Sequence, residues 1–240
     1  MTHTISVGMQ VLVGVIVGVL SYLLGNVNNA IMLSKLKGKD IRTCGSGNPG
    51  TMNMIRTFGK PMGAITLVLD ISKGVIPALL GWLFMGDGEF LSLGADRIGL
   101  YVAGLCTEIG HIYPVFMKFK GGKGIATVFG VCMVAQPIAM TVSFVLGTAF
   151  LLITKIGSLT SFAMICTALT LEGVRAASEP LALPCAILIF AMFALTLFAH
   201  RTNLIKLFSG NERQVVLVKS KKAKPPVDRS ILFNQPIVIE

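Results

Sequence analysis

Most of this chain consists of long apolar segments separated by short segments rich in glycine and basic residues. One apolar stretch runs for 29 residues, over 125–153, and several others approach the roughly 20 residues that a helix needs to cross a bilayer. Hydrophobic residues make up 53% of the 240 residues and charged residues only 13%, unlike soluble domains. The sequence therefore predicts an all-α, polytopic integral membrane protein without a separate soluble domain.

The other predicted spans are 5–25, 62–85, 97–110, 158–177 and 181–199. The first of them has no Lys or Arg before it and no small-residue cleavage pattern after it, which favours an uncleaved helix over a signal peptide. The stretch 125–153 is too long for one span. Because Gln136-Pro137 falls near its middle, it permits either one kinked helix or two short helices.

The distribution of basic residues decides between these alternatives. With two short helices, 18 of the 21 Lys and Arg residues fall on one side, in the segments 26–61, 111–124, 154–157 and 200–240. The excess of Lys and Arg in cytoplasmic loops therefore predicts seven transmembrane helices, with the N-terminus outside and the C-terminus in the cytoplasm. We expect the short fourth and fifth helices to be candidates for incomplete crossing.

Net charge and domain organisation follow from the same pattern. A formal charge of +10 in so apolar a chain indicates cytoplasmic loops near anionic lipid rather than nucleic-acid binding. We expect a membrane domain over 1–212 and a basic cytoplasmic tail over 213–240. The five cysteines show no metal-like spacing, so we interpret them as free thiols.

The first loop, residues 45–50, has the composition of an anion-binding turn. Its glycines, Gly45, Gly47 and Gly50, permit positive φ and leave backbone N–H groups free to face one ligand. Polar side chains accompany them: Ser46, Asn48 and Arg56, of which the last offers a planar fork for two phosphate oxygens. A tight structural turn is the alternative, but the added polar groups favour anion binding.

Thr51 and Met52 follow this loop where a Walker A motif needs Lys and then Ser or Thr, so ATP hydrolysis is disfavoured.

The second loop, residues 118–124, repeats this pattern with lysines. Gly121 and Gly122 let the backbone approach a ligand, while Lys120 and Lys123 supply cations. Lysines in cytoplasmic loops also serve topology alone, so this interpretation is weaker. The third basic segment begins at His200, and Asn203 shares a face with it if the last span continues as a helix. A helix cap and a site residue are equally compatible with His200.

In this order the segments resemble those of the bacterial, PlsY-type, acyl-phosphate-dependent glycerol-3-phosphate acyltransferases of the inner membrane. The resemblance covers residues 1 to about 212. The matching motifs are Gly45 to Gly50 with Asn53 and Arg56, Gly110-His111 with Phe119 to Thr127, His200 to Asn203 with Gly210 and Glu212, and Asp70 with Lys73-Gly74.

The resemblance implies seven transmembrane helices and an active site that faces the cytoplasm. It implies transfer of a fatty acyl group from acyl phosphate to the 1-hydroxyl of sn-glycerol 3-phosphate, which gives lysophosphatidic acid and inorganic phosphate, the first acylation of phospholipid biosynthesis. It implies no cofactor, no metal, and no direct use of acyl-CoA or acyl carrier protein. Membrane lipids and the enzyme that makes acyl phosphate are the implied partners.

The resemblance also assigns residue roles. The implied catalytic residues are Ser46, Arg56, His200 and Asn203. The implied substrate-binding residues are Gly45, Gly47, Asn48, Gly50, Thr51, Asn53, Lys120, Gly121, Gly122, Lys123 and Ser158, with Ser161 as an alternative to Ser158. Glu212 matches a position with a structural role.

Two features need separate interpretation. The family usually has Ala-Thr-Asn after the last glycine of the first loop, whereas this chain has Thr51-Met52-Asn53. A one-residue shift turns a helical side chain by about 100°, so donor type or affinity is the property affected. Glu108, inside an apolar span, is expected to be paired or to face a cavity, with Lys73 as the candidate partner.

Three hypotheses follow. No histidine is followed five residues later by Asp, so the His-Asp acyltransferase arrangement is absent. The substrate phosphate is therefore expected to accept the proton, with His200 as an orienting residue or weak base. A family member with another acceptor or donor is the second hypothesis. A transporter of a phosphorylated metabolite is the third, because Asp70, Lys73 and Glu108 lie within spans.

Overall fold

The computed structural model describes residues 6–85, 96–178 and 182–210. The elements in these ranges are α-helices and 3-10 helices, in agreement with the predicted all-α class. The helices are α1 (Val7–Gly25), α2 (Asn29–Leu36), η1 (Ile41–Thr43), α3 (Thr51–Phe58), α4 (Lys60–Met85), α5 (Ile98–Ile112), η3 (Val115–Met117), α6 (Ile125–Ala135), α7 (Pro137–Thr154), α8 (Gly157–Ala176) and α9 (Ala182–Phe208).

The predicted break in the longest apolar stretch is present. Helix α6 ends at Ala135, and α7 begins with Pro137 at its first position. Proline excludes the preceding residue from the helical region, and Gln136 accordingly has φ −141° and ψ 72°. The two-helix alternative is therefore confirmed over the kinked single helix.

Six helical segments are long and apolar enough to cross a membrane, and α6 is a shorter apolar helix, among the residues described. At 11 residues α6 is about 16 Å long, roughly half of the hydrocarbon thickness. Helix α7 has 18 residues, so the expectation of incomplete crossing fits α6 alone.

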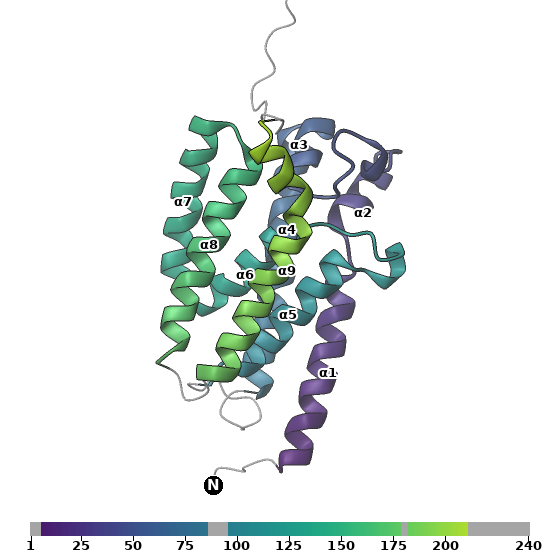
Figure 1. Ribbon diagram of the computed structural model, residues 1–240. Helices are drawn as coiled ribbons and strands as arrows, with labels where there is room; N and C mark the ends of the chain where they lie inside the picture. The colour runs from purple at the N-terminus through teal and green to yellow at the C-terminus, as the bar shows by residue number, and fades with distance from the viewer. Residues whose placement is uncertain (1–5, 86–95, 179–181, 211–240) are drawn as a thin grey trace, which may run out of the picture.

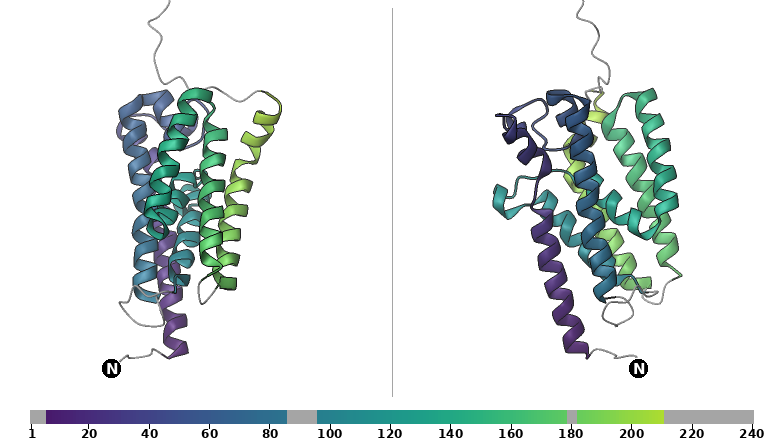
Figure 2. Two further views of the ribbon diagram at one scale, coloured as in Figure 1. Left: turned by 90° about the vertical axis from the view of Figure 1, so that its left-hand side faces the viewer. Right: turned by 180° about the vertical axis from the view of Figure 1, so that it is seen from behind.

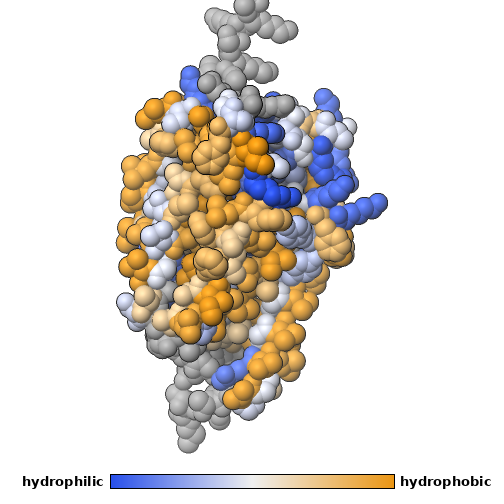
Figure 3. Space-filling model, in the orientation of Figure 1, coloured by the Kyte–Doolittle hydropathy of each residue, from blue (hydrophilic) through white to orange (hydrophobic). Residues whose placement is uncertain are grey.

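The long helices form one bundle, with α1 along one side (Figure 1). Helix α5 packs against α1, α4 and α9, and α6 packs between α4 and α8, so these two helices form the centre of the bundle. The C-terminal end of α9 and helix α3 lie at the same end, opposite the N-terminus, and both views in Figure 2 agree with this arrangement. Most of the surface in Figure 3 is apolar, and its hydrophilic residues gather near α2 and α3.

A buried polar cluster joins α5 and α8 to the break between α6 and α7. Glu172 of α8 is 1% exposed; its Oε1 accepts hydrogen bonds from Tyr101 of α5 and, at 2.9 Å, from Nε of Arg175. Its Oε2 accepts a 2.9 Å bond from Gln136 at the break between α6 and α7. Both carboxylate oxygens of Glu172 thus accept hydrogen bonds, and the bond from Gln136 connects the break to α8.

Candidate active site

The first loop is held in place by the side chain of Asn53. This amide is 1% exposed; its oxygen accepts a 3.0 Å bond from the Ser46 N–H, and its nitrogen donates to the carbonyl oxygens of Ile41 and Cys44 at 3.2 and 2.9 Å. Gly45 has φ +56°, and a Cβ there would lie 2.2 Å from the Asn53 oxygen. Only glycine fits this position. The hydrogen bonds of Asn53 therefore determine the shape of the loop.

Three N–H groups of the first loop are bonded within the protein and do not face a ligand. The N–H groups of Ser46, Gly47 and Gly50 bond to Asn53, to the Cys44 carbonyl at 2.9 Å and to the Asn48 carbonyl at 3.0 Å. The competing turn interpretation is thus correct for the backbone of these three residues. Side chains remain for ligand binding: Ser46 is exposed, and Asn48 is half-buried.

Helix α3 begins directly after this loop. Thr51, Met52 and Arg56 are half-buried on it, and Gly50 precedes its first residue. The side chain of Arg56 therefore extends from the second turn of α3, more than one turn after the loop.

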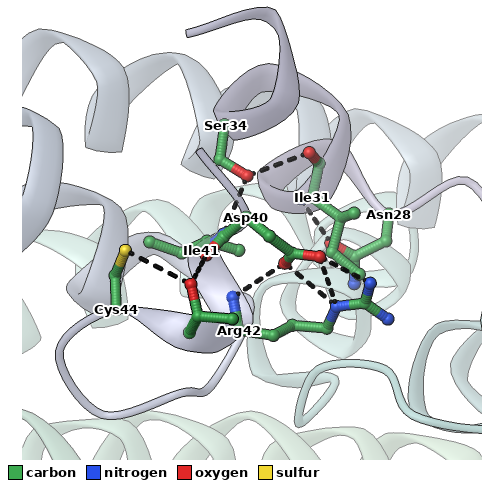
Figure 4. A network of polar contacts seen from close by, with 8 residues as sticks. Asn28, Ile31, Ser34, Asp40, Ile41, Arg42 and Cys44 are labelled. Carbon is green, nitrogen blue, oxygen red and sulfur yellow. Dashed lines mark hydrogen bonds and ion pairs between the residues drawn. The ribbon is translucent and has the colours of Figure 1, made fainter. Parts of the chain in front are cut away.

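A polar network supports the first loop from the side of α2 (Figure 4). The Ser34 hydroxyl donates to the Ile31 carbonyl at 2.9 Å and accepts from the Ile41 N–H at 3.0 Å, which connects α2 to η1. Asp40 accepts from the backbone N–H of Arg42 at 2.9 Å and pairs with its guanidinium at 2.6 Å. The hydrogen bonds from Arg42 lower the pKa of Asp40 to about 2, and the carboxylate in turn raises the pKa of Arg42.

The glycines of the second loop pack against the end of α5. A Cβ on Gly122 would lie 2.2 Å from Nε2 of His111, and one on Gly121 would lie 2.0 Å from the His111 carbonyl oxygen. Their N–H groups bond to the carbonyl oxygens of Ile112 and His111, both at 3.1 Å. These glycines thus permit close packing of the loop on His111, which is 4% exposed, a role that the sequence did not predict.

The second loop and α9 meet at Lys123. Its ammonium group donates a hydrogen bond to the amide oxygen of Asn203, and both side chains are half-buried. Lys120 is exposed, as is Lys118. The structure thus separates two lysines that the sequence treated alike, and brings only Lys123 to Asn203.

The third basic segment is helical rather than a loop, because α9 continues to Phe208. His200 and Asn203 therefore share a face, as their spacing predicted. His200 is 3% exposed; its Nδ1 lies 2.9 Å from the Thr196 carbonyl oxygen, and its ring packs edge-on against Phe162 with centroids 5.1 Å apart. A carbonyl oxygen only accepts, so Nδ1 carries the proton and Nε2 is left as the acceptor.

Ser158 lies in the first turn of α8, one turn before Phe162. It is 5% exposed, and its hydroxyl has no hydrogen-bond partner within the described ranges. Because Ser158 and Phe162 share a helix face, the hydroxyl lies on the side of α8 that faces His200. Ser161, three residues further along α8, is half-buried.

The charged residues within spans are paired differently from the expectation. Lys73 donates to the Val27 carbonyl oxygen at 2.8 Å and lies 3.4 Å from Asp70, which also accepts from Asn29 at 2.9 Å. These bonds attach the α1–α2 connection to α4. The pairing of Lys73 with Glu108 is wrong, because Glu108 accepts from Thr196 instead, at 2.6 Å.

Glu212 and the tail 213–240 lie outside the described residues. All five cysteines are free, as predicted. Thr196, Phe162 and His111 are the site's supporting residues that sequence reasoning missed or left undecided. The spacing of Thr196 and His200, four residues apart on an apolar helix, was the available signal.

The described site thus has a half-buried ammonium, an exposed hydroxyl and a buried imidazole at the polar end of an apolar bundle. Such a combination suits an anionic head group attached to a substrate with an apolar chain.

Known proteins are similar to this chain in sequence and in fold. A family model described as glycerol-3-phosphate acyltransferase matches residues 15–210. The glycerol-3-phosphate acyltransferase of Thermoanaerobacter pseudethanolicus is 36% identical over 204 residues, which cover 84% of this chain and 95% of that protein. The protein of the same name from Aquifex aeolicus is 35% identical over 198 residues, 82% of this chain and 96% of its own.

Two solved structures are similar throughout. The crystal structure of PlsY, an integral membrane glycerol 3-phosphate acyltransferase, in its glycerol 3-phosphate form matches with a TM-score of 0.74 and 34% identity, covering 84% of this chain and 94% of that one. Its lysophosphatidic acid form matches with a TM-score of 0.73 and 33% identity, covering 85% and 96%.

Proposed function

Since this chain belongs to the glycerol-3-phosphate acyltransferase family, we propose that it uses acyl phosphate as donor, at a site formed by the first loop, the second loop and α9. The chain is an acyltransferase that acylates glycerol 3-phosphate and produces lysophosphatidic acid. With acyl phosphate, the 1-hydroxyl oxygen forms the new ester bond, the acyl–phosphate bond breaks, and inorganic phosphate leaves. The chain is therefore an enzyme, in contrast to the transporter hypothesis.

The contact between Lys123 and Asn203 carries this proposal. It joins two motifs 80 residues apart and places a half-buried cation at the end of α9. We assign Lys123 to the phosphate of a substrate, because the hydrogen bond to Asn203 gives this cation a defined position beside α9. Lys120, being exposed, contributes attraction rather than a fixed contact.

The roles proposed for the first loop rest on the chemistry of its side chains and on the hydrogen bonds that shape it. Arg56 is assigned to the phosphate that departs, and the Ser46 hydroxyl to the reacting groups. Asn48 and Thr51 supply further polar contacts. Asn53, Gly45, Gly47 and Gly50 act by shaping the loop, and Gly121 and Gly122 by seating the second loop on His111.

We assign the role of proton acceptor to the phosphate group of the substrate. Acyl phosphate is already activated, so its own phosphate accepts the proton of the attacking hydroxyl as the acyl bond breaks. His200, with Nδ1 bonded to Thr196, presents Nε2 as an acceptor that orients the hydroxyl. Asn203 holds Lys123, and Ser158 faces His200 from α8.

The donor is tested by supplying purified protein with glycerol 3-phosphate and equal concentrations of acyl phosphate, acyl-CoA or acyl carrier protein. We expect lysophosphatidic acid from acyl phosphate alone. Product from either thioester at a comparable rate would overturn the donor assignment. Replacing Met52 by Thr, the usual family residue, is expected to lower the KM for acyl phosphate.

We further propose seven spans, with α6 as the short one, the N-terminus outside, and the active site facing the cytoplasm of a bacterial inner membrane. The one-sided distribution of Lys and Arg supports this orientation. A variant that keeps Cys44 as its sole cysteine should react with an impermeant maleimide in inverted membrane vesicles and not in right-side-out ones. The opposite labelling would reverse the topology. The enzyme that makes acyl phosphate, and membrane lipids, are the proposed partners.

A further inference from the structure

A buried carboxyl group beneath the second loop has no role in the proposed mechanism. Glu108 of α5 is fully buried, and its Oε1 accepts a 2.6 Å hydrogen bond from the Thr196 hydroxyl of α9. Among the described residues, its Oε2 has no hydrogen-bond partner. A half-satisfied carboxyl inside a span costs more free energy than an apolar side chain of similar size. Stability therefore does not explain this residue.

Thr196 connects Glu108 to the site. While its hydroxyl donates to Glu108, its carbonyl oxygen accepts from Nδ1 of His200 at 2.9 Å. Thr196, His200 and Asn203 follow one another at spacings of four and three residues, so they line one face of α9. Along this face α9 contacts Glu108, then Phe162 of α8 at His200, then Lys123 at Asn203.

Glu108 also lies against the second loop. Gly124, the residue after Lys123, has φ +86° and directly precedes α6. A Cβ on Gly124 would lie 3.1 Å from Cγ and 3.3 Å from Oε1 of Glu108. One side chain thus touches the neighbour of Lys123 and bonds to the residue one turn before His200.

We propose that Glu108 is a positioning residue for acyl transfer. By holding Thr196 beneath Gly124, it sets the spacing between Lys123 and the face of α9 that carries His200 and Asn203. The inference rests on the proposed function, because it concerns the geometry of that same site. A displacement of about 1 Å between catalytic groups can cost on the order of 100-fold in rate, so one interhelical hydrogen bond is enough to matter.

The test compares apolar and polar replacements at both ends of the bond. Glu108→Leu and Thr196→Val remove the hydrogen bond and nearly preserve the side-chain volume. Glu108→Gln and Thr196→Ser preserve the hydrogen bond. We expect kcat to fall about tenfold or more in the first pair, with KM for glycerol 3-phosphate changed less than about threefold, and to stay within about threefold of wild type in the second pair. The melting temperature of Glu108→Leu should not fall.

Thr107→Val is the matched control. Thr107 is fully buried on α5, next to Glu108, but its hydroxyl bonds within its own helix, to the Ala103 carbonyl oxygen at 2.7 Å. Its kcat should match wild type. The double variant Glu108→Leu/Thr196→Val should lose no more than the worse single variant, because both changes remove one bond.

Wild-type kcat in both Glu108→Leu and Thr196→Val, or losses that multiply in the double variant, would overturn the proposal. If Glu108→Leu does not fold, Thr196→Val and Thr196→Ser decide alone. The assay uses whichever donor supports lysophosphatidic acid formation by the wild type. If acyl phosphate is not the donor, the wild type itself shows this. If Glu108 has no positioning role, only the variants show it.

Discussion

Lys123 in the second loop donates a hydrogen bond to the side-chain oxygen of Asn203 in α9, and this contact joins two parts of the site that lie 80 residues apart. Neither residue type is unusual at the polar end of a membrane helix. Their contact nevertheless gives Lys123 a fixed position that Lys120, which is exposed, does not have.

Lys123→Ala and Lys120→Ala should therefore differ. We expect Lys123→Ala to lower kcat/KM by about 100-fold or more, because a fixed charge on a phosphate is worth roughly 2–3 kcal/mol. Lys120→Ala should cost only a few-fold, and its effect should shrink as salt concentration rises. Equal losses in a steady-state assay at low and high salt would contradict the distinction.

Gly122→Ala tests the packing of the second loop on His111. The added methyl group would lie 2.2 Å from Nε2 of His111, so we expect a loss of about 1–3 kcal/mol in stability and reduced activity. Gly173→Ala is the control, since nothing lies within 4 Å of a Cβ there. Thermal unfolding in detergent measures both. The double variant His111→Ala/Gly122→Ala should recover part of the activity; a double variant no better than Gly122→Ala would argue against this contact.

Asn53→Ala removes three hydrogen bonds from the first loop at once. The expected loss is about 2–4 kcal/mol of stability, together with most of the activity, because the loop loses its support. Asn53→Asp keeps the acceptor for the Ser46 N–H but sets a carboxyl oxygen against the carbonyl oxygens of Ile41 and Cys44, so it should be no more stable than Asn53→Ala. A fully active, stable Asn53→Ala variant would show that the loop holds its shape without this amide.

The Asp40–Arg42 pair makes a pH-dependent contribution to stability. Arg42 lowers the pKa of Asp40 from 3.8 to about 2, so the contribution is fully present above about pH 4 and is lost as the pH falls towards 2. The effect is small, because the side chains are 26% and 32% exposed. The difference in melting temperature between wild type and Asp40→Asn should be constant from pH 7 to pH 5 and shrink below pH 4. A difference that grows on acidification would contradict this assignment.

Arg56→Ala and His200→Ala test the assigned chemistry. Arg56→Ala should nearly eliminate turnover, because charge on the departing phosphate loses its partner. His200→Ala should lower the rate without abolishing it, because the substrate phosphate accepts the proton. Equal, near-wild-type rates for both variants would contradict these roles.

Sequence reasoning reached the helical class and the shared face of His200 and Asn203, because both depend on local periodicity. It reached the break at Gln136 because proline marked the place and the distribution of Lys and Arg favoured two helices over one. It could not reach the packing of Gly122 on His111 or the bond between Glu108 and Thr196, because these depend on which helices become neighbours. It also assigned the glycines of both loops to ligand approach. Their small size instead admits Asn53 and His111, a choice that glycine alone does not reveal.

The most direct test of the account is to measure inorganic phosphate and lysophosphatidic acid together, using purified protein, acyl phosphate and glycerol 3-phosphate. We expect the two products in equal amounts, only when both substrates are present, and almost none from Arg56→Ala. Phosphate release that does not depend on glycerol 3-phosphate, or lysophosphatidic acid formed without release of phosphate, would contradict it.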